Sequence, residues 1–347
     1  MNIAIRADAS IRRGSGHVMR CLTLAEALRR EGDTVRFLCR DDPGHLGEEI
    51  VRRGFALTLL PLEEVAVCQA MLAEGVDGLI VDHYGLDIHW ERAMRSYARV
   101  LMVIDDLDDR AHDCDLLLNQ NVLTSSPLAG EGWGGGEDRR RSQLLLGPRY
   151  ALLREEFERT DRLQRPGRLE HLLIFFGGTD APNLTERVLE QLAPLSPPLT
   201  ADVVIGMGNP HQERIAARCQ ASDGRWTLHV QTDRMAELMA QADLALGAGG
   251  SSHWERCRMG LPALVITLAE NQIAVTRQLD QQGACWWLGE GATLRPEIVG
   301  ETLRALLVDP MPLVTMSAAA QQIVPGGGTA KVVNELKQLW LSKLAGA

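Results

Sequence analysis

The fold class is decided by one stretch near the start of the chain, RADASIRRGSGHVMR, which spans residues 6–20. Residues 2–7 have the pattern of a short apolar strand, and from Val18 onward apolar residues recur at the spacing of one helix face. A Gly-Ser-Gly turn and His17 occupy the junction. In open α/β sheets such a junction lies at the carboxyl end of a strand, where ligands bind. The stretch therefore predicts a strand, a ligand-facing turn and a helix.

The turn itself carries chemistry. Gly14, Ser15 and Gly16 would let backbone amides approach a ligand, and the start of the helix favours an anion. His17 can exchange protons near neutral pH. A lone histidine is otherwise a solvated or core residue, so the functional interpretation depends on a matching site in the second half of the chain.

Length and composition limit the number of domains and the classes of partner that fit this chain. The chain has 347 residues, 45% hydrophobic and 24% charged, enough for two soluble domains. A net charge of -10 disfavours nucleic acid or an acidic membrane as a partner. We see no apolar run of membrane-spanning length and no signal peptide, so we expect a cytoplasmic protein. The seven cysteines form no C-x-x-C pair and are expected to be mostly buried hydrophobes.

Strand and helix signals alternate in both halves, which predicts parallel sheets covered by helices. Strands are expected at 2–7, 34–39, 56–60, 78–82, 100–104 and 116–118, then at 170–176, 201–205, 226–230, 243–247 and 263–267. Helices are expected near 17–30, 45–53, 64–74, 88–98 and 150–160, with an amphipathic helix at 331–344.

The domain organisation follows from this alternation. We expect an N-terminal domain at 1–160, a C-terminal domain at 168–330 and a C-terminal helix at 331–347, with a linker at 162–168. Residues 124–142 are rich in Gly, Ser and charge, and they predict a flexible surface insertion, with a functional lid as the alternative. Two such halves suggest a small-molecule site in a cleft between domains.

The strongest motif of the second half begins where a strand meets the run GAGGSSHWE, residues 247–255. Gly249, Gly250, Ser251 and Ser252 could cap the next helix while their amides and hydroxyls bind phosphate oxygens. Glu255, one turn later, could accept hydrogen bonds from a ribose diol. No G-K-[ST] follows, so this is not a Walker loop.

Two further motifs are weaker. Gly177-Gly178-Thr179-Asp180 follows a strand and could be either a ligand contact or a tight turn with an Asp cap. Glu270, Asn271 and Gln272 end another strand; they suit sugar hydroxyls and acetamido groups, or simply form a polar first helical turn.

In the first half, Asp82, His83 and Tyr84 end a strand and should face the same cleft as His17. The acidic run 105–109 could bind a divalent ion, although a loop whose acids pair with Arg110 is favoured. Residues 119–121, Asn-Gln-Asn, could add amides to the same site.

Together these motifs resemble one family, the UDP-2,4-diacetamido-2,4,6-trideoxy-beta-L-altropyranose hydrolases of pseudaminic acid biosynthesis. The resemblance covers nearly the whole chain except 124–142. The second half also resembles the nucleotide-binding domain of the peptidoglycan UDP-GlcNAc transferase. The resemblance implies an α/β, GT-B-like fold, in which two Rossmann-like parallel-sheet domains face a cleft.

The resemblance also implies the roles. The reaction is hydrolysis of the anomeric C–O bond, with inversion, releasing UDP and the free diacetamido sugar. His17 would activate water, Tyr84 would line the sugar pocket, and either Asp8 or Ser15 could orient His17. The remaining expected substrate-binding residues are Gly14, Ser15, Gly16, Gly178, Gly249, Gly250, Ser251, Ser252, Glu255, Glu270, Asn271 and Gln272. No cofactor and no metal is implied.

Two alternatives stay open. A glycosyltransferase of the GT-B class would pass the sugar to an acceptor instead of water, although the N-terminal half shows no long apolar or basic patch for a lipid-linked acceptor. A non-catalytic UDP-sugar binding protein would lose no reaction on replacement of His17. The expected partners are the UDP-sugar and UDP.

Overall fold

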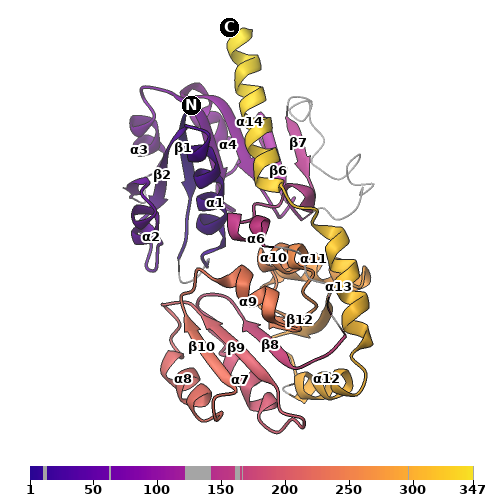
Figure 1. The fold of residues 1–347 in the computed structure, drawn as a ribbon. Coiled ribbons are helices and arrows are strands. Elements are labelled where there is room, and N and C mark those ends of the chain that lie inside the picture. Colours follow the sequence, from indigo (N-terminus) through magenta and orange to yellow (C-terminus); the bar gives the residue numbers. More distant parts are fainter. Residues whose placement is uncertain are drawn as a thin grey trace. The chain divides into compact units, whose positions relative to one another are not determined.

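The computed structural model describes residues 1–10, 14–61, 64–121, 142–160, 165, 167–295 and 297–346. Its contacts divide the chain into two compact units, one made of Met1–Arg154 and Gly327–Ala347, the other of Glu155–Gly326. Each unit is a parallel sheet with covering helices (Figure 1), so the predicted α/β class is confirmed. The end of the chain returns to the first unit, and residues 155–160, expected in the N-terminal domain, group with the second unit.

The first unit contains a seven-stranded sheet in the order β3-β2-β1-β4-β5-β6-β7. Every neighbouring pair is parallel. The strand order reverses between β1 and β4, and in open α/β sheets ligands bind beside the carboxyl ends at such a reversal. Its elements are β1 (Asn2–Ala7), α1 (Gly16–Arg30), β2 (Thr34–Arg40), α2 (Gly47–Arg52), β3 (Ala56–Leu60), α3 (Glu64–Met71), β4 (Val76–Asp82), α4 (Ile88–Met94), a 3-10 turn (Arg95–Tyr97), β5 (Ala98–Ile104), β6 (Leu116–Asn119), β7 (Gln143–Leu146), a second 3-10 turn (Pro148–Tyr150) and α14 (Gly328–Ala345).

Helices cover both faces of this sheet. Side chains of α1, α2 and α14 pack with Ile3 and Ile5 of β1 in one buried cluster. The intervening Ala4 belongs to the cluster on the other face, where α3 and α4 supply Cys68, Trp90 and others. This alternation along β1 is what a strand buried on both faces requires.

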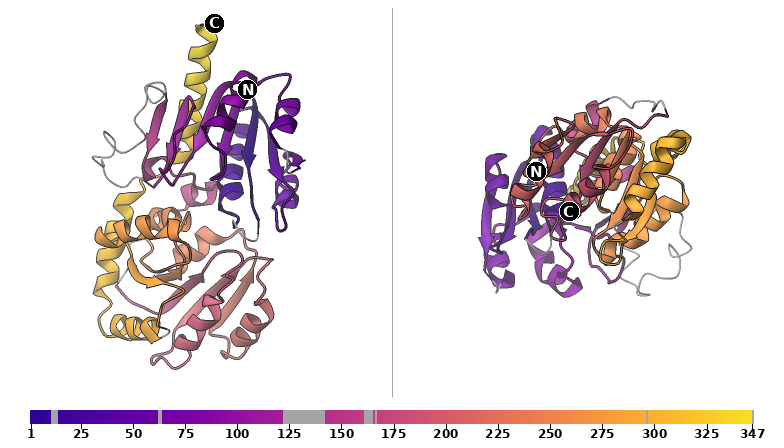
Figure 2. Two further views of the ribbon diagram at one scale, coloured as in Figure 1. Left: turned by 180° about the vertical axis from the view of Figure 1, so that it is seen from behind. Right: turned by 90° about the horizontal axis from the view of Figure 1, so that it is seen from below.

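The C-terminal helix is anchored to the first unit at its start. The Thr329 hydroxyl donates to the Leu153 carbonyl oxygen at 3.1 Å. A Cβ on Gly328 would lie 2.3 Å from the Ala151 carbonyl oxygen, so only glycine allows this approach. The last turn of α14 extends beyond the amino ends of the strands (Figures 1 and 2), and Leu341 and Leu344 are exposed there.

The second unit contains a six-stranded sheet in the order β10-β9-β8-β11-β12-β13, all parallel, with its reversal between β8 and β11. Both of its expected glycine motifs follow these two strands. Its elements are α6 (Glu155–Arg159), β8 (His171–Phe175), α7 (Leu184–Leu192), β9 (Thr200–Ile205), α8 (Gln212–Gln220), β10 (Trp226–Val230), α9 (Met235–Gln241), β11 (Leu244–Gly247), α10 (Ser252–Met259), β12 (Ala263–Thr267), α11 (Glu270–Gln281), β13 (Trp286–Glu290), α12 (Glu297–Val308) and α13 (Met311–Ile323).

The expected strands are all present, but the sequence missed two edge strands, β7 and β13. The helices predicted at 88–98 and 150–160 are wrong in extent, because α4 ends at Met94 and only a 3-10 turn and the short α6 occupy the second range. The predicted insertion at 124–142 lies outside the described residues except for Ser142, whose hydroxyl donates to the Cys114 carbonyl oxygen at 2.6 Å. Most of the predicted linker at 162–168 also lies outside them.

Candidate functional site

The turn before α1 is shaped by glycine. Gly14 has a φ of 78°, and its N–H donates to the Ser10 carbonyl oxygen at 2.8 Å; residues 11–13 lie outside the described part. Ser15 is the N-cap of α1 but makes no side-chain cap hydrogen bond. A Cβ built on Gly16 meets no atom within 4 Å. The backbone here therefore has open space on the side of Gly16.

His17, in the first turn of α1, is held by Asp82. Its Nδ1 lies 2.6 Å from Asp82 Oδ1, and the side chain is 9% exposed. Asp82 is the last residue of β4 and lies beside Ala7 of β1, at the reversal of the sheet. Since Asp82 is a carboxylate, Nδ1 carries the proton of this hydrogen bond, and Nε2 is the nitrogen left to accept a proton.

Arg20 binds the same carboxylate. Its Nε and Nη2 donate to the two oxygens of Asp82 at 2.6 and 2.7 Å, and its Nη1 pairs with Asp106. Burial alone would raise the pKa of Asp82, but Arg20 and His17 outweigh it and hold that pKa far below its usual range. Asp82 is thus a permanent anion between a guanidinium and an imidazole.

Tyr84 completes this arrangement. Its ring meets the ring of His17 edge to face, with 4.4 Å between centroids and 81° between planes. Tyr84 is half-buried, and its ring contact together with the His17–Asp82 hydrogen bond brings the three residues together within the first unit. Figure 1 labels α1, which carries His17, and β1, which pairs with the strand that ends at Asp82.

Neither of the two residues expected to orient His17 does so. Asp8 is paired with Arg6, whose Nη2 donates to it at 2.9 Å, and it also accepts from the Arg40 N–H at 2.8 Å. Ser15 makes no side-chain cap bond, and the partner of His17 Nδ1 is Asp82. The sequence predicted that Asp82 faces the same cleft as His17 but could not assign it this role.

The acidic run after β5 is a paired loop, as favoured from the sequence. Arg110 lies 3.3 Å from Asp105 and 2.9 Å from Asp109, while Asp106 pairs with Arg20. Within the described residues no group of three or more His, Cys, Asp or Glu side chains is arranged to hold a metal ion.

The amides expected from residues 119–121 mostly serve the backbone. Gln120 Oε1 accepts from the Leu152 N–H at 2.7 Å, and Asn119 Oδ1 accepts from the Asn121 N–H at 2.9 Å. Asn119 and Gln120 are 2% and 3% exposed. The suggestion that these two amides line a ligand site is therefore wrong.

In the second unit, the turn after β8 is tightly packed. Gly177 has a φ of 93°, and a Cβ on Gly206 of the next loop would lie 2.6 Å from the Gly178 carbonyl oxygen. Asp180 accepts from the N–H groups of Leu184 and Thr185 at 2.9 and 2.8 Å. The helix-capping interpretation of Asp180 is thus confirmed.

The loop from Gly249 to Ser252 leads into α10. Gly250 has a φ of 89°. Ser251 is the N-cap but makes no side-chain cap hydrogen bond, so the expected capping by its hydroxyl is wrong. Ser251 is exposed and Ser252 half-buried. These hydroxyls lie at the start of a helix, the position that suits phosphate oxygens.

The first turn of α11 packs on this loop. A Cβ on Gly249 would lie 2.9 Å from Gln272 Cβ, so glycine is required for the approach. Gln272 Oε1 accepts from the Leu268 N–H at 2.9 Å. Glu270 and Asn271 are exposed, and Glu255 of α10 is half-buried. The structure therefore brings Gly249 and Gln272 together within the second unit.

A buried histidine that the sequence analysis did not single out joins the two helices. His253 Nε2 lies 2.9 Å from Thr276 Oγ1, and Arg256 donates to His253 Nδ1 at 3.0 Å. Burial first, and then Arg256, lower the pKa of His253 well below its ordinary value. This imidazole is neutral and fixes α10 against α11.

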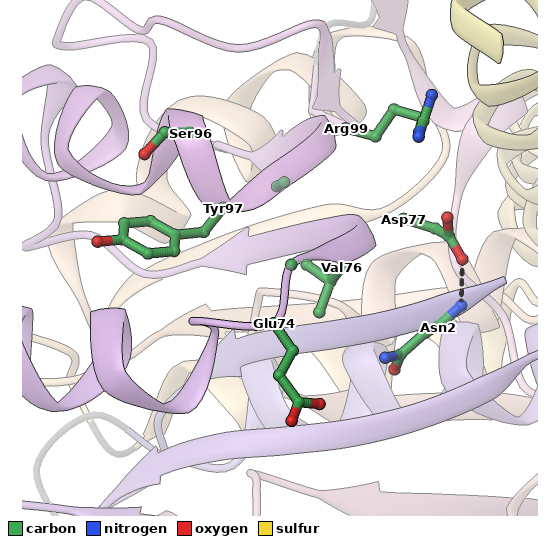
Figure 3. A pocket seen from close by; sticks show the side chains of 9 residues that line it. Asn2, Glu74, Val76, Asp77, Ser96, Tyr97 and Arg99 are labelled. Atoms are coloured by element: carbon green, nitrogen blue, oxygen red, sulfur yellow. Dashed lines mark hydrogen bonds between the residues drawn. The ribbon is translucent and has the colours of Figure 1, made fainter.

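A pocket of about 510 Å³ lies at the amino ends of β1, β4 and β5, opposite to the strand ends near Asp82 (Figure 3). Asn2, Asp77 and Arg99 line it, and the Asn2 N–H donates to Asp77 at 2.7 Å. Ligands of open α/β sheets bind at the carboxyl ends instead. We therefore place the candidate site at Asp82 and not in this pocket.

All seven cysteines are buried and free, as expected. Over the described residues, no single helix passes a length and hydropathy test for a membrane span; one bent pair, Glu297–Val308 with Met311–Ala345, passes it by length and composition.

Comparison with known proteins gives a consistent result. Residues 171–329 match the glycosyltransferase family 28 C-terminal domain. An uncharacterised protein of Methanocaldococcus jannaschii is 27% identical over 79% of this chain, and that match spans 56% of the relative's length. The spore coat polysaccharide biosynthesis protein SpsG of Bacillus subtilis is 26% identical, over 98% of this chain and 99% of its own.

The UDP-2,4-diacetamido-2,4,6-trideoxy-beta-L-altropyranose hydrolase of Campylobacter jejuni is 24% identical over 82% of this chain and 97% of its own length. The resemblance drawn from the motifs is thus confirmed. Among solved structures, MurG of Acinetobacter baumannii matches with a TM-score of 0.66 and 16% identity, over 97% of this chain and 99% of its own. The fold is of the GT-B type.

Proposed function

We propose that this chain, whose second unit matches the glycosyltransferase family 28 C-terminal domain, hydrolyses UDP-2,4-diacetamido-2,4,6-trideoxy-beta-L-altropyranose to UDP and the free sugar. The observation that carries the proposal is the His17–Asp82 hydrogen bond of 2.6 Å at the reversal of the first sheet. The similarity to the Campylobacter jejuni hydrolase supports the choice of substrate.

His17 acts as the general base. Its Nδ1–H donates to Asp82, which fixes the tautomer and leaves Nε2 to take a proton from water. The water oxygen attacks the anomeric carbon while the bond from that carbon to the diphosphate oxygen breaks. The electron pair of that bond leaves with UDP, and attack from the opposite face inverts the configuration. Asp82 stabilises the imidazolium that results.

One base is sufficient for this reaction. Ordinary glycosidases use two carboxylates because an alkoxide leaving group needs a proton. UDP leaves as a stabilised diphosphate, so an acid is less necessary. General base catalysis contributes roughly 100- to 10,000-fold. No metal or other cofactor is part of the proposal.

The second unit supplies the proposed UDP contacts. The amides from Gly249 to Ser252 and the start of α10 take the diphosphate, which is the ligand that a helix N-terminus favours. Glu255 accepts from the ribose hydroxyls. Gly178, Glu270, Asn271 and Gln272 are proposed substrate contacts, and in the first unit so are Tyr84 and the turn from Gly14 to Gly16.

The alternative is a glycosyltransferase that uses the same UDP-sugar with an acceptor. The match to a glycosyltransferase domain and the GT-B fold support this second candidate. The two candidates differ in one observable, which is whether UDP is released when water is the only acceptor.

The test is UDP release from this UDP-sugar, followed by NMR, with the unaltered chain, His17→Asn and the control His89→Asn. His89 is an exposed histidine of α4. We expect UDP and inverted free sugar from the unaltered chain and the control, with or without chelator, and a loss of roughly 100- to 10,000-fold in His17→Asn. No release without an acceptor refutes the hydrolase, and full activity in His17→Asn refutes the base assignment.

A further inference from the structure

A second histidine of the first unit lies between two buried carboxylates. His112 Nδ1 is 2.6 Å from Glu91 Oε1, and His112 Nε2 is 3.2 Å from Asp105 Oδ2. Glu91, on α4, and Asp105, directly after β5, are both 0% exposed, and His112 is 8% exposed. The other Glu91 oxygen accepts from the Asp113 N–H at 2.5 Å. One imidazole thus ties helix α4 to the end of a strand.

The geometry sets the charge of His112. Carboxylates only accept hydrogen bonds, so an imidazole that satisfies one on each side must carry a proton on both nitrogens. Burial by itself would lower the pKa of His112, but Asp105 and Glu91 outweigh it and raise that pKa to about 9. His112 is therefore an imidazolium at neutral pH.

The loop that His112 anchors, residues 105–113, contacts the proposed catalytic arrangement twice. Asp106 pairs with Nη1 of Arg20, the residue whose other nitrogens bind Asp82. Arg110 donates to the carbonyl oxygen of His83, the residue between Asp82 and Tyr84, at 3.2 Å. The loop braces both the carboxylate that holds His17 and the backbone that carries Tyr84.

We propose that His112 is a positioning residue, which pins the loop 105–113 between Glu91 and Asp105 and so holds Asp82 and His17 in their catalytic geometry. The expected effect of His112 on kcat rests on the proposed hydrolase function, whereas its expected effect on the His17–Asp82 hydrogen bond does not. Burying an ion pair costs desolvation free energy, so the pairs of His112 with Glu91 and Asp105 are weak evidence for added stability. Such pairs can instead fix one conformation of a loop, which is the role proposed here.

The expected size follows from geometry. The two hydrogen-bond partners of His112 are Glu91 and Asp105, not His17 or Asp82, so its loss shifts the base without removing it. A displacement of about 1 Å at a reacting group lowers the rate by roughly 100-fold. We expect a fall in kcat of about 10- to 100-fold with UDP affinity unchanged, since the proposed UDP contacts lie in the second unit.

The kinetic experiment compares His112→Gln, His112→Lys and the control His89→Gln. Gln removes the cation, whereas Lys keeps a cation that can donate to both carboxylates. We expect His112→Gln to lose kcat, His112→Lys to recover part of it, and His89→Gln to match the unaltered chain. Equal loss in the Gln and Lys variants, or normal kcat in His112→Gln, overturns the proposal. If His112→Gln does not fold, the single variant Glu91→Gln, which removes one of the two carboxylates that bind His112, is compared with the single variant His112→Lys.

A second readout needs no substrate. The imidazole N–H proton that joins His17 to Asp82 is followed by NMR and assigned by its absence in His17→Asn. We expect its signal to shift or broaden in His112→Gln and to stay unchanged in His89→Gln. An unchanged signal in His112→Gln overturns the positioning role even if hydrolysis is never observed. A changed signal without any hydrolysis supports it and refutes only the proposed function.

Discussion

Replacing Asp82 by Asn is the most informative single change in the first unit. Asp82 is fully buried and accepts hydrogen bonds from His17 at 2.6 Å and from Arg20 at 2.6 and 2.7 Å. An amide of the same shape removes the negative charge and presents an N–H group to one of these donors. His17 is then no longer held with its proton on Nδ1, which is the tautomer that a base at Nε2 requires.

The expected loss of rate is large. In a serine protease, the equivalent carboxylate-to-amide change lowers kcat by about 10,000-fold because the wrong histidine tautomer is selected. For Asp82→Asn we expect a fall of roughly 1,000- to 10,000-fold, or about 4–5.5 kcal/mol of transition-state stabilisation. The assay is UDP release at saturating UDP-sugar.

Stability falls as well, because Arg20 loses its ion pair with Asp82 and keeps the one with Asp106. Breaking a buried ion pair typically costs about 3–5 kcal/mol. With a urea slope of about 2 kcal/mol/M, the midpoint for the first unit falls by roughly 1.5–2.5 M. Kinetics must therefore be measured on folded protein.

Asp8→Asn is the matched control. Asp8 is 1% exposed, follows the neighbouring strand β1 and is paired with Arg6 rather than with His17. We expect a similar loss of stability and a loss of kcat below about tenfold, since the hydrogen bond from His17 to Asp82 is left in place. If Asp82→Asn is folded and its kcat is within tenfold of the Asp8→Asn value, Asp82 does not set the state of a catalytic base and the reasoning fails.

Three further predictions concern other parts of the chain. Glu255→Ala lowers UDP affinity by about tenfold but leaves the affinity for 2′,3′-dideoxy-UDP unchanged, as measured by calorimetry, because only the ribose contact is lost; equal losses for both ligands contradict the ribose assignment. The folded-state pKa of His112, about 9, lies above the unfolded value, so its stabilising contribution is complete below about pH 6.5 and is lost as pH rises through 9. The urea midpoint of the unaltered chain should therefore decrease as the pH is raised from about 6.5 to above 9. An identical decrease in His112→Gln would show that another group is responsible. Gly328→Ala forces its Cβ toward the Ala151 carbonyl oxygen, at 2.3 Å, and lowers the melting temperature of the first unit; an unchanged melting temperature would show that α14 can shift without loss.

The sheets were predictable because their strands are buried on both faces. Residues 2–7 and 263–267 are nearly continuous apolar runs, and both form the expected strands. The missed strand β13, WWLGE, lies at a sheet edge with only partly buried residues and a glycine, so no continuous apolar run marks it. The edge strands β3 and β10 were predicted, so the lack of a continuous apolar run, and not edge position alone, hides a strand from sequence analysis.

The partners of His17 were harder to predict. The local part of the signal was present, because His17 and Arg20 are three residues apart on one helix and therefore share a face. Their common anion, Asp82, is 62 residues beyond Arg20 and is brought there only by the crossover that places β4 beside β1. The pairing of His112 with Glu91 depends in the same way on tertiary packing of α4.

A comparison of the two units shows why local pattern alone cannot assign a catalytic histidine. His17 and Arg20 recur as His253 and Arg256, again in the first turn of a helix that follows a strand at the sheet reversal. In the second unit neither of these partners of His253 is a carboxylate: Arg256 donates to Nδ1 of His253, and Thr276, whose hydroxyl donates to the Gln272 carbonyl oxygen, accepts from Nε2. Both ring nitrogens of His253 are thereby engaged, and its pKa is lowered by burial and by Arg256, so it can neither receive a proton nor hold a charge. Next to Asp82, Nδ1 of His17 is engaged by a carboxylate and Nε2 is left for the proposed base chemistry, so the difference between the two histidines lies in one carboxylate from a distant strand.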